Sequence, residues 1–138
     1  MRYAHYWYGQ VTLTPDLTGD IFSLLLTAQA EVCGGDGAGL PEVTAEYIRF
    51  NGSLVRGESH EAFALHDGLN DSYCATAAYS YDAVVGATLL RVRHHNPGFD
   101  VESDGLWDDD WADARALYEQ VFGERPERPT RLAERHGR

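Results

Sequence analysis

Histidines and carboxylates are the side chains here with the chemistry for catalysis or metal binding, and their spacing argues against both. His60 and His66 fall on one face of a predicted strand, but six strand residues span about 20 Å, too far for one ion. His94 and His95 are adjacent near a predicted helix end, so they do not share a helix face. The acidic run 108–110 lacks the alternating spacing of a calcium loop and is typical of a helix N-terminus. We therefore predict no metal site.

Motifs for nucleophilic or phosphate chemistry are also missing from the sequence. Neither Cys33 nor Cys74 belongs to a CxxC or CxxH motif, so we predict two buried thiols. The loop 34–41 holds four glycines but no Walker-type pattern and no lysine. No GxSxG, HExxH or paired-carboxylate motif occurs. We therefore predict no catalytic residues and no cofactor, and the lack of these motifs argues against an enzyme.

Aromatic side chains point instead to binding. Tyrosine and tryptophan give rigid contact area with a polar tip, which suits ligand pockets and interfaces. Arg49, Arg91 and Arg93 are among the few cations in an acidic body, and one of them beside such rings would bind an anionic group. We predict a ligand site drawn from Tyr6, Tyr8, Arg49, Asn51, His60 and Trp107.

Hydrophobic periodicity and turn residues predict the elements that must position these side chains. We predict strands over 6–13, 44–50, 60–66, 73–77 and 99–103. We predict helices over 14–33, over 80–95 and from the acidic run to Phe122. Asn51-Gly52 predicts a turn. Runs of adjacent strands indicate an α+β domain, a mostly antiparallel sheet of four to five strands with about three helices packed on it.

Length and charge bound the function further. The 138 residues suffice for one domain, predicted over 1–123, and the Arg-, Pro- and Glu-rich segment 124–138 is predicted to be a disordered tail. A net charge of −11, with no lysine, disfavours direct nucleic-acid or membrane binding. No signal peptide or membrane-length apolar run occurs, so we predict a cytoplasmic protein.

Four segments resemble a family of small, mostly uncharacterised proteins of actinobacterial phages and prophages. They are PEVTAEYIRFNG (41–52), HEAFAL (60–65), YDAVV (81–85) and VESDGLWDDDWADARALYEQVFG (101–123). The FNG and SDGxW blocks are the most specific, and the similarity runs from about residue 5 to residue 123. In that family a basic K-T-A-R-K-P stretch precedes the YD pair, whereas this chain has ATAAYSYD at 75–82.

The resemblance implies a phage-type accessory protein acting on a host process in the host cytosol, and three functions follow in order of preference. The first is a non-enzymatic protein that sequesters a small nucleotide-like immune signal in an aromatic and arginine pocket, a kind of pocket often found at a homo-oligomer interface. The second is an acidic interaction protein, a DNA mimic or an inhibitor of a host enzyme. The third is a small hydrolase of such signals, with His60 or His66 as acid or base.

Overall fold

The computed structural model describes residues 3–134, and in that range the chain is a single α+β domain, as predicted. Its helices are α1 (Pro15–Thr27), α2 (Asp82–His95) and α3 (Ala112–Phe122). Its strands are β1 (Ala4–Val11), β2 (Val32–Cys33), β3 (Glu42–Val43), β4 (Tyr47–Gly52), β5 (Phe63–His66), β6 (Gly68–Ala75) and β7 (Asp100–Ser103). All strand pairs are antiparallel.

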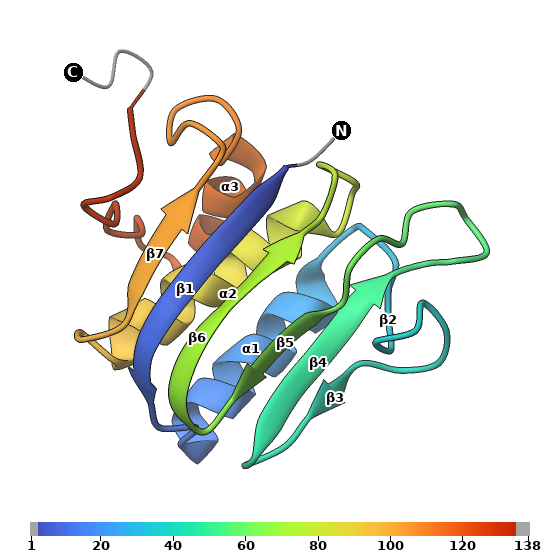
Figure 1. Ribbon diagram of the computed structural model, residues 1–138, viewed down its shortest axis with the longest axis horizontal. Coiled ribbons are helices and arrows are strands. Elements are labelled where there is room, and N and C mark those ends of the chain that lie inside the picture. The colour runs from blue at the N-terminus through green and yellow to red at the C-terminus, as the bar shows by residue number, and fades with distance from the viewer. Residues whose placement is uncertain (1–2, 135–138) are drawn as a thin grey trace.

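Two small sheets lie side by side and form one curved layer. In the first, β1 is the middle strand between β6 and β7, and it pairs with β6 along its whole length. In the second, β4 pairs with β2, β3 and β5. Strand β5 lies next to β6 (Figure 1), and just before β5 the amide of Glu61 donates to the carbonyl of Ala75 at 3.2 Å. The sheets therefore meet along the β5–β6 seam.

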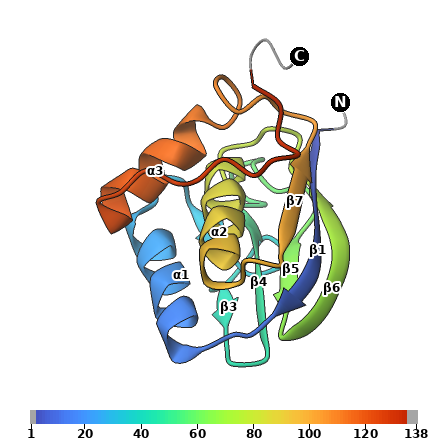
Figure 2. The ribbon, with the colours of Figure 1, turned by 90° about the vertical axis from the view of Figure 1, so that its left-hand side faces the viewer.

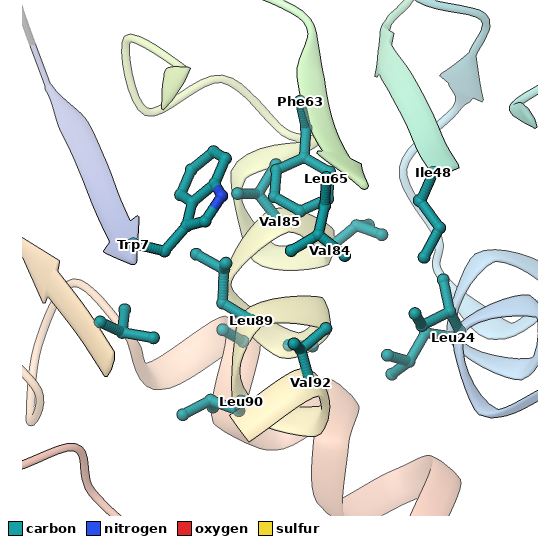
Figure 3. Close-up of a cluster of buried hydrophobic side chains, with 14 of the residues drawn as sticks. Trp7, Leu24, Ile48, Phe63, Leu65, Val84, Val85, Leu89, Leu90 and Val92 are labelled. Atoms are coloured by element: carbon teal, nitrogen blue, oxygen red, sulfur yellow. The ribbon is translucent and has the colours of Figure 1, made fainter. Parts of the chain in front are cut away.

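All three helices cover the same side of this layer (Figure 2). Helix α2 is the central one, and it is buried on most of its circumference because the sheet, α1 and α3 all pack against it. Trp7 from β1 and Phe63 and Leu65 from β5 point towards α2 (Figure 3), and Trp7 and Phe63 have ring centroids 5.0 Å apart. The core thus lies between the helices and the inner face of the sheet.

The first helix begins as predicted and ends earlier. Thr14 caps it, with its hydroxyl accepting from the amide of Leu17 at 3.2 Å, and Pro15 is the first helical residue. The chain leaves the helix at Ala28, although the apolar spacing predicted helix up to residue 33. Val32 and Cys33 form β2 instead, because they pair with Gly52 and Asn51 of β4. Strand pairing distant in sequence overrides the local periodicity there.

The middle of the chain shows two further differences from the prediction. Asn51 and Gly52 are the buried last residues of β4, and the turn comes later, with Gly57 at a φ of 70°. Strand β6 begins at Gly68, five residues before the predicted start, and ends at Ala75. Ala77 and Ala78 follow it with φ of 54° and 59°, in the left-handed region, so the strand cannot extend through them.

The segment after α3 is packed against the domain where the sequence predicts a disordered tail. Gly123 ends α3 with a φ of 70°, and the chain then runs past α3 and α2 to the β7 edge (Figure 2). Leu132 is fully buried, and the carbonyl of Ala133 accepts from the amide of Trp107 at 2.7 Å. One buried leucine and this backbone bond hold a segment whose composition is otherwise polar. Residues 135–138 of the predicted tail lie outside the described residues.

Candidate functional site

The side of the sheet that faces away from the helices carries a row of tyrosines. Side chains alternate along a strand, so His5 and Trp7 of β1 point to the core while Tyr6 and Tyr8 point outward. The register places Tyr73 of β6 opposite Tyr6. We call this surface the outer face, and its outward residues are Tyr6, Tyr8, Tyr47, Arg49, His66, Leu69, Asp71, Tyr73, Asp100 and Glu102. No described helix or strand covers it (Figure 2).

Tyr6 and Tyr73 form the centre of the outer face. Their ring centroids lie 6.1 Å apart with the planes tilted by 33°. Tyr73 is 47% exposed, and Leu69, four residues earlier on the same side of β6, is also exposed. Apolar and aromatic area of this kind, left in solvent on a rigid sheet, is typical of contact surfaces.

A cluster of opposite charges lies at the β1–β7 end of this face. The Tyr8 hydroxyl donates to the Glu102 carboxylate at 2.8 Å. Partial burial and this hydrogen bond raise the pKa of Tyr8 to about 12, so the phenol stays a neutral donor at physiological pH. Arg131 of the C-terminal segment lies over the Tyr8 ring, 5.6 Å from its centroid, and pairs with Asp100 at 2.9 Å and Glu102 at 3.7 Å. Tyr8 and the two carboxylates together raise the pKa of Arg131.

A shallow cavity of about 420 Å³ adjoins this cluster. It is lined by Tyr8, Gly9, Leu69, Asn70, Asp71 and Arg131. Asn70 is buried, and its amide donates to the carbonyls of His66 and Gly68, so it shapes the β5–β6 turn. The cavity is therefore a groove on the outer face with a cation and a ring at one end.

At the β3–β4 end of the outer face, the side chains of Arg49 and Tyr47 are engaged in contacts within the domain. Arg49 lies 3.9 Å from Glu42 and against Gly35, where a methyl group would fall 2.1 Å from the guanidinium carbon. The Tyr47 hydroxyl donates to Glu42 at 2.5 Å. Arg49 therefore serves the β3–β4 pair and the adjoining loop, and lies on a different sheet from Tyr6 and Tyr8.

Asn51 and His60 contact each other, but in a structural arrangement. The Asn51 amide group donates to the carbonyls of Gly35 at 3.1 Å and His60 at 2.9 Å, while its oxygen accepts from the His60 amide at 3.1 Å. This buried side chain thus fastens two loops with all of its hydrogen-bonding capacity engaged. The His60 ring donates through Nδ1 to the carbonyl of Ala75 at 2.7 Å, since a carbonyl only accepts.

Trp107 lies away from the outer face and packs into the domain. The ring centroids of Trp107 and Trp111 lie 6.2 Å apart. The Arg115 guanidinium lies 5.0 Å from the ring centroid of Trp107. The Trp107 backbone amide holds the C-terminal segment. The six predicted site residues therefore do not converge on one place. Tyr6 and Tyr8 lie together on the outer face, Asn51 and His60 contact each other elsewhere, and Trp107 supports the C-terminal segment.

A buried Ser-His-Asp chain is the arrangement in this structure that most resembles catalytic machinery. His5 Nδ1 is 2.8 Å from Ser103 Oγ, and His5 Nε2 is 2.6 Å from Asp82 Oδ1. Ser103 Oγ also accepts from Trp111 Nε1 at 3.0 Å and from the Gly105 amide at 2.9 Å.

Both lone pairs of Ser103 are thus engaged, so its own proton goes to His5 Nδ1 and the Nε2–H of His5 goes to Asp82. A hydroxyl so saturated has no electron pair to offer a substrate. The cavity beside this chain, about 290 Å³, is lined by Asp82 and Tyr3 and not by Ser103. The chain ties β1, β7 and the start of α2 together and is structural.

The two thiols and Arg91 also have structural surroundings. Cys33 and Cys74 are buried and unpaired, and burial raises the pKa of the Cys74 thiol to about 12. Arg91 bonds Asp20 at 2.7 Å and lies 3.9 Å from the Phe122 ring centroid, so it joins α1, α2 and α3. In residues 3–134 no group of three His, Cys, Asp or Glu side chains is arranged to hold a metal ion. No helix in that range is long and apolar enough to cross a bilayer.

Two features kept most of the outer face out of the sequence prediction. Leu69, Asp71 and Tyr73 share one side of β6, but the polar Asn70 and Ser72 between them give no apolar alternation, and the predicted strand begins only at Tyr73. Arg131 falls in the segment predicted to be disordered, whereas its ion pairs with Asp100 and Glu102 and the burial of its neighbour Leu132 hold it in place. Asp100 and Glu102 lie in a correctly predicted strand, and the structure places them on one side of it, opposite to the buried Val101.

Comparisons of the chain with protein-family models, with curated proteins and with solved structures found no match.

Proposed function

We propose that this protein is a non-catalytic interaction protein that binds a protein partner rich in basic side chains through the outer face. This is the acidic-interaction alternative of the sequence analysis. The observation that carries it is the open tyrosine row, Tyr6, Tyr8 and Tyr73, flanked by the carboxylates of Asp71, Asp100 and Glu102. The phage-family resemblance is what suggests a host protein as that partner.

Charge supports a basic partner. The chain carries 22 acidic residues against 11 basic ones, so its field attracts cations and speeds their encounter. Tyrosine contributes contact area that loses little side-chain entropy, whereas scattered surface carboxylates alone give weak, unspecific attraction. Together they favour a specific basic surface over polyanions such as nucleic acid.

Titration of the ¹⁵N-labelled protein with a hexa-arginine peptide at 150 mM salt tests this proposal. We expect amide shifts confined to β1, β6 and β7, because the peptide should contact the tyrosine row. Tyr73→Ser should weaken binding about three- to tenfold, as expected for loss of one well-placed aromatic contact. Tyr79→Ser is the matched control, since Tyr79 is also a partly exposed tyrosine but contacts His60 away from the outer face.

Equal affinities for the two variants would mean that bulk charge drives binding, and the proposal would fail. Shifts spread over the helices would also contradict it. Sedimentation of the free protein gives a further outcome: a dimer that Tyr73→Ser dissociates would assign the outer face to a second copy of the chain instead.

A nucleotide-like small ligand is the second candidate, favoured by one observation. Arg131 and Tyr8 meet at the groove beside Gly9, which gives a phosphate partner and a stacking ring at one place. Against it, Asp100 and Glu102 already neutralise Arg131 and would repel a phosphate. For this reason the protein partner is preferred.

A thermal-shift panel of cyclic di- and trinucleotides and ADP-ribose derivatives tests the second candidate. A ligand present at a hundred times its Kd adds about 2.7 kcal/mol of stability, a shift of several degrees in a domain of this size. The shift should vanish in Arg131→Ala and persist in Arg125→Ala. A flat panel, or a shift that both variants retain, would reject a ligand in this groove.

A further inference from the structure

Arg131 occupies part of the surface to which a basic partner would bind. Its guanidinium contacts two carboxylates of β7 and the ring of Tyr8, all from the outer face. It comes from the C-terminal segment, over 25 residues beyond β7 in sequence. The segment therefore brings a cation to acidic and aromatic groups that the sheet presents by itself.

The groups around Arg131 fit a guanidinium better than an ammonium. A guanidinium is planar, donates in several directions at once, and stacks on aromatic faces while remaining paired with carboxylates. Asp100 and Glu102 are two residues apart on one side of β7, and Tyr8 pairs with Asp100 in the register of β1. The Tyr8 hydroxyl fixes the Glu102 carboxylate, so the site is organised by the sheet and not by Arg131.

We propose that Tyr8, Asp100 and Glu102 form a recognition site for an arginine side chain of the partner, and that Arg131 is an internal occupant which this arginine displaces. This inference rests on the proposed function, and adds the chemistry of the partner and a built-in competitor. It follows that the free protein masks its own site, and that only partners offering arginine at the right place unmask it.

The C-terminal segment can release the site without detaching from the domain. Its backbone is anchored by the buried Leu132 and by the bond between Ala133 and Trp107. The Arg131 side chain is 55% exposed and its partners are partly in solvent, so its ion pairs contribute little and can exchange. A rotation of this side chain is enough to open the site.

Anisotropy titrations with labelled hexa-arginine and hexa-lysine peptides at 150 mM salt test this inference. Arg131→Ala should bind hexa-arginine about threefold or more tightly than the natural protein, because every molecule is then competent. Arg125→Ala is the control, since it removes the same charge from the same segment but has no ion pair among the described residues. Its affinity should change by less than about twofold. Hexa-lysine should gain less than hexa-arginine from Arg131→Ala.

Adding Glu102→Gln to Arg131→Ala should abolish the gain in affinity for hexa-arginine. Equal tightening by Arg131→Ala and Arg125→Ala would overturn the internal competitor, while the proposed function would stand if Tyr73→Ser still weakened binding. Equal gains for the lysine and arginine peptides would overturn arginine recognition. If neither Tyr73→Ser nor Arg131→Ala changed the affinity for hexa-arginine, both proposals would be overturned together.

Discussion

Asn51 illustrates how a residue that suits ligand binding becomes structural once its partners are known. Its side chain was predicted to contact a ligand beside a turn. It instead holds the loop that begins at Gly35 to the segment at His60, using both the amide and the oxygen. Nothing in the spacing of these three residues indicates that they meet, since the β2–β4 pair brings the Gly35 loop to Asn51 and the β4–β5 pair brings the His60 segment there.

Asn51→Asp should destabilise the protein without affecting binding. A carboxylate of the same shape cannot donate, so the carbonyls of Gly35 and His60 would face an acceptor in a buried place. We expect a loss of about 1–3 kcal/mol in the free energy of unfolding, measured by urea denaturation. Unchanged stability together with lost peptide binding would restore Asn51 to the site.

At the scale of the elements, α1 and α2 are joined by one carboxylate. Asp20 of α1 accepts from Arg91 at 2.7 Å and from His95 at 2.8 Å, both on α2. Burial alone would raise the pKa of Asp20, but these two hydrogen bonds outweigh it and the pKa is lowered. A carboxylate whose pKa is depressed on folding stabilises the protein above its unfolded pKa, and this stability is lost as the pH falls through the folded value.

Asp20→Asn should therefore be destabilising at pH 7 by about 1–2 kcal/mol, with the difference shrinking below about pH 4. Urea denaturation of both proteins between pH 2.5 and pH 7 measures this. Asp16→Asn in the same helix is the control, because Asp16 is exposed and should show a smaller effect. A deficit that stays constant down to pH 2.5 would mean that the charge of Asp20 is not what joins the helices.

The elements that local chemistry defines are the ones the sequence predicted well. Thr14 and Pro15 begin α1, and Gly123 ends α3, because caps depend on neighbours within a few residues. Strand β2 and the first half of β6 depend on partners far along the chain, so neither could be read from a local pattern. The same limit applies to the candidate site: Tyr6 and Tyr8 were found, but Tyr73 and Arg131 join them only through long-range pairing.

At the scale of the whole molecule, the C-terminal segment links the helical layer to the sheet edge. Leu132→Ala should destabilise the protein by about 2–4 kcal/mol, because the leucine is fully buried and its loss leaves a cavity. Urea denaturation measures the loss, and limited trypsin digestion should show faster cleavage after Arg131, because Arg125 and Arg128 are each followed by a proline that blocks trypsin. Arg125→Ala should leave stability within about 0.5 kcal/mol. Equal stability of the leucine variant and the natural protein would return the segment to a disordered tail.

The central position of β1 has a consequence for how the chain folds. This strand is synthesised before both of its partners, β6 and β7, whose paired residues lie at least 57 and at least 92 positions later in the chain. Its aromatic residues therefore have no strand partners until most of the chain has left the ribosome. Contacts so distant in sequence also slow the formation of the native strand pairs. The segment that presents Tyr6 and Tyr8 is thus also the one that stays unpaired longest during synthesis, and it is therefore exposed to misassociation.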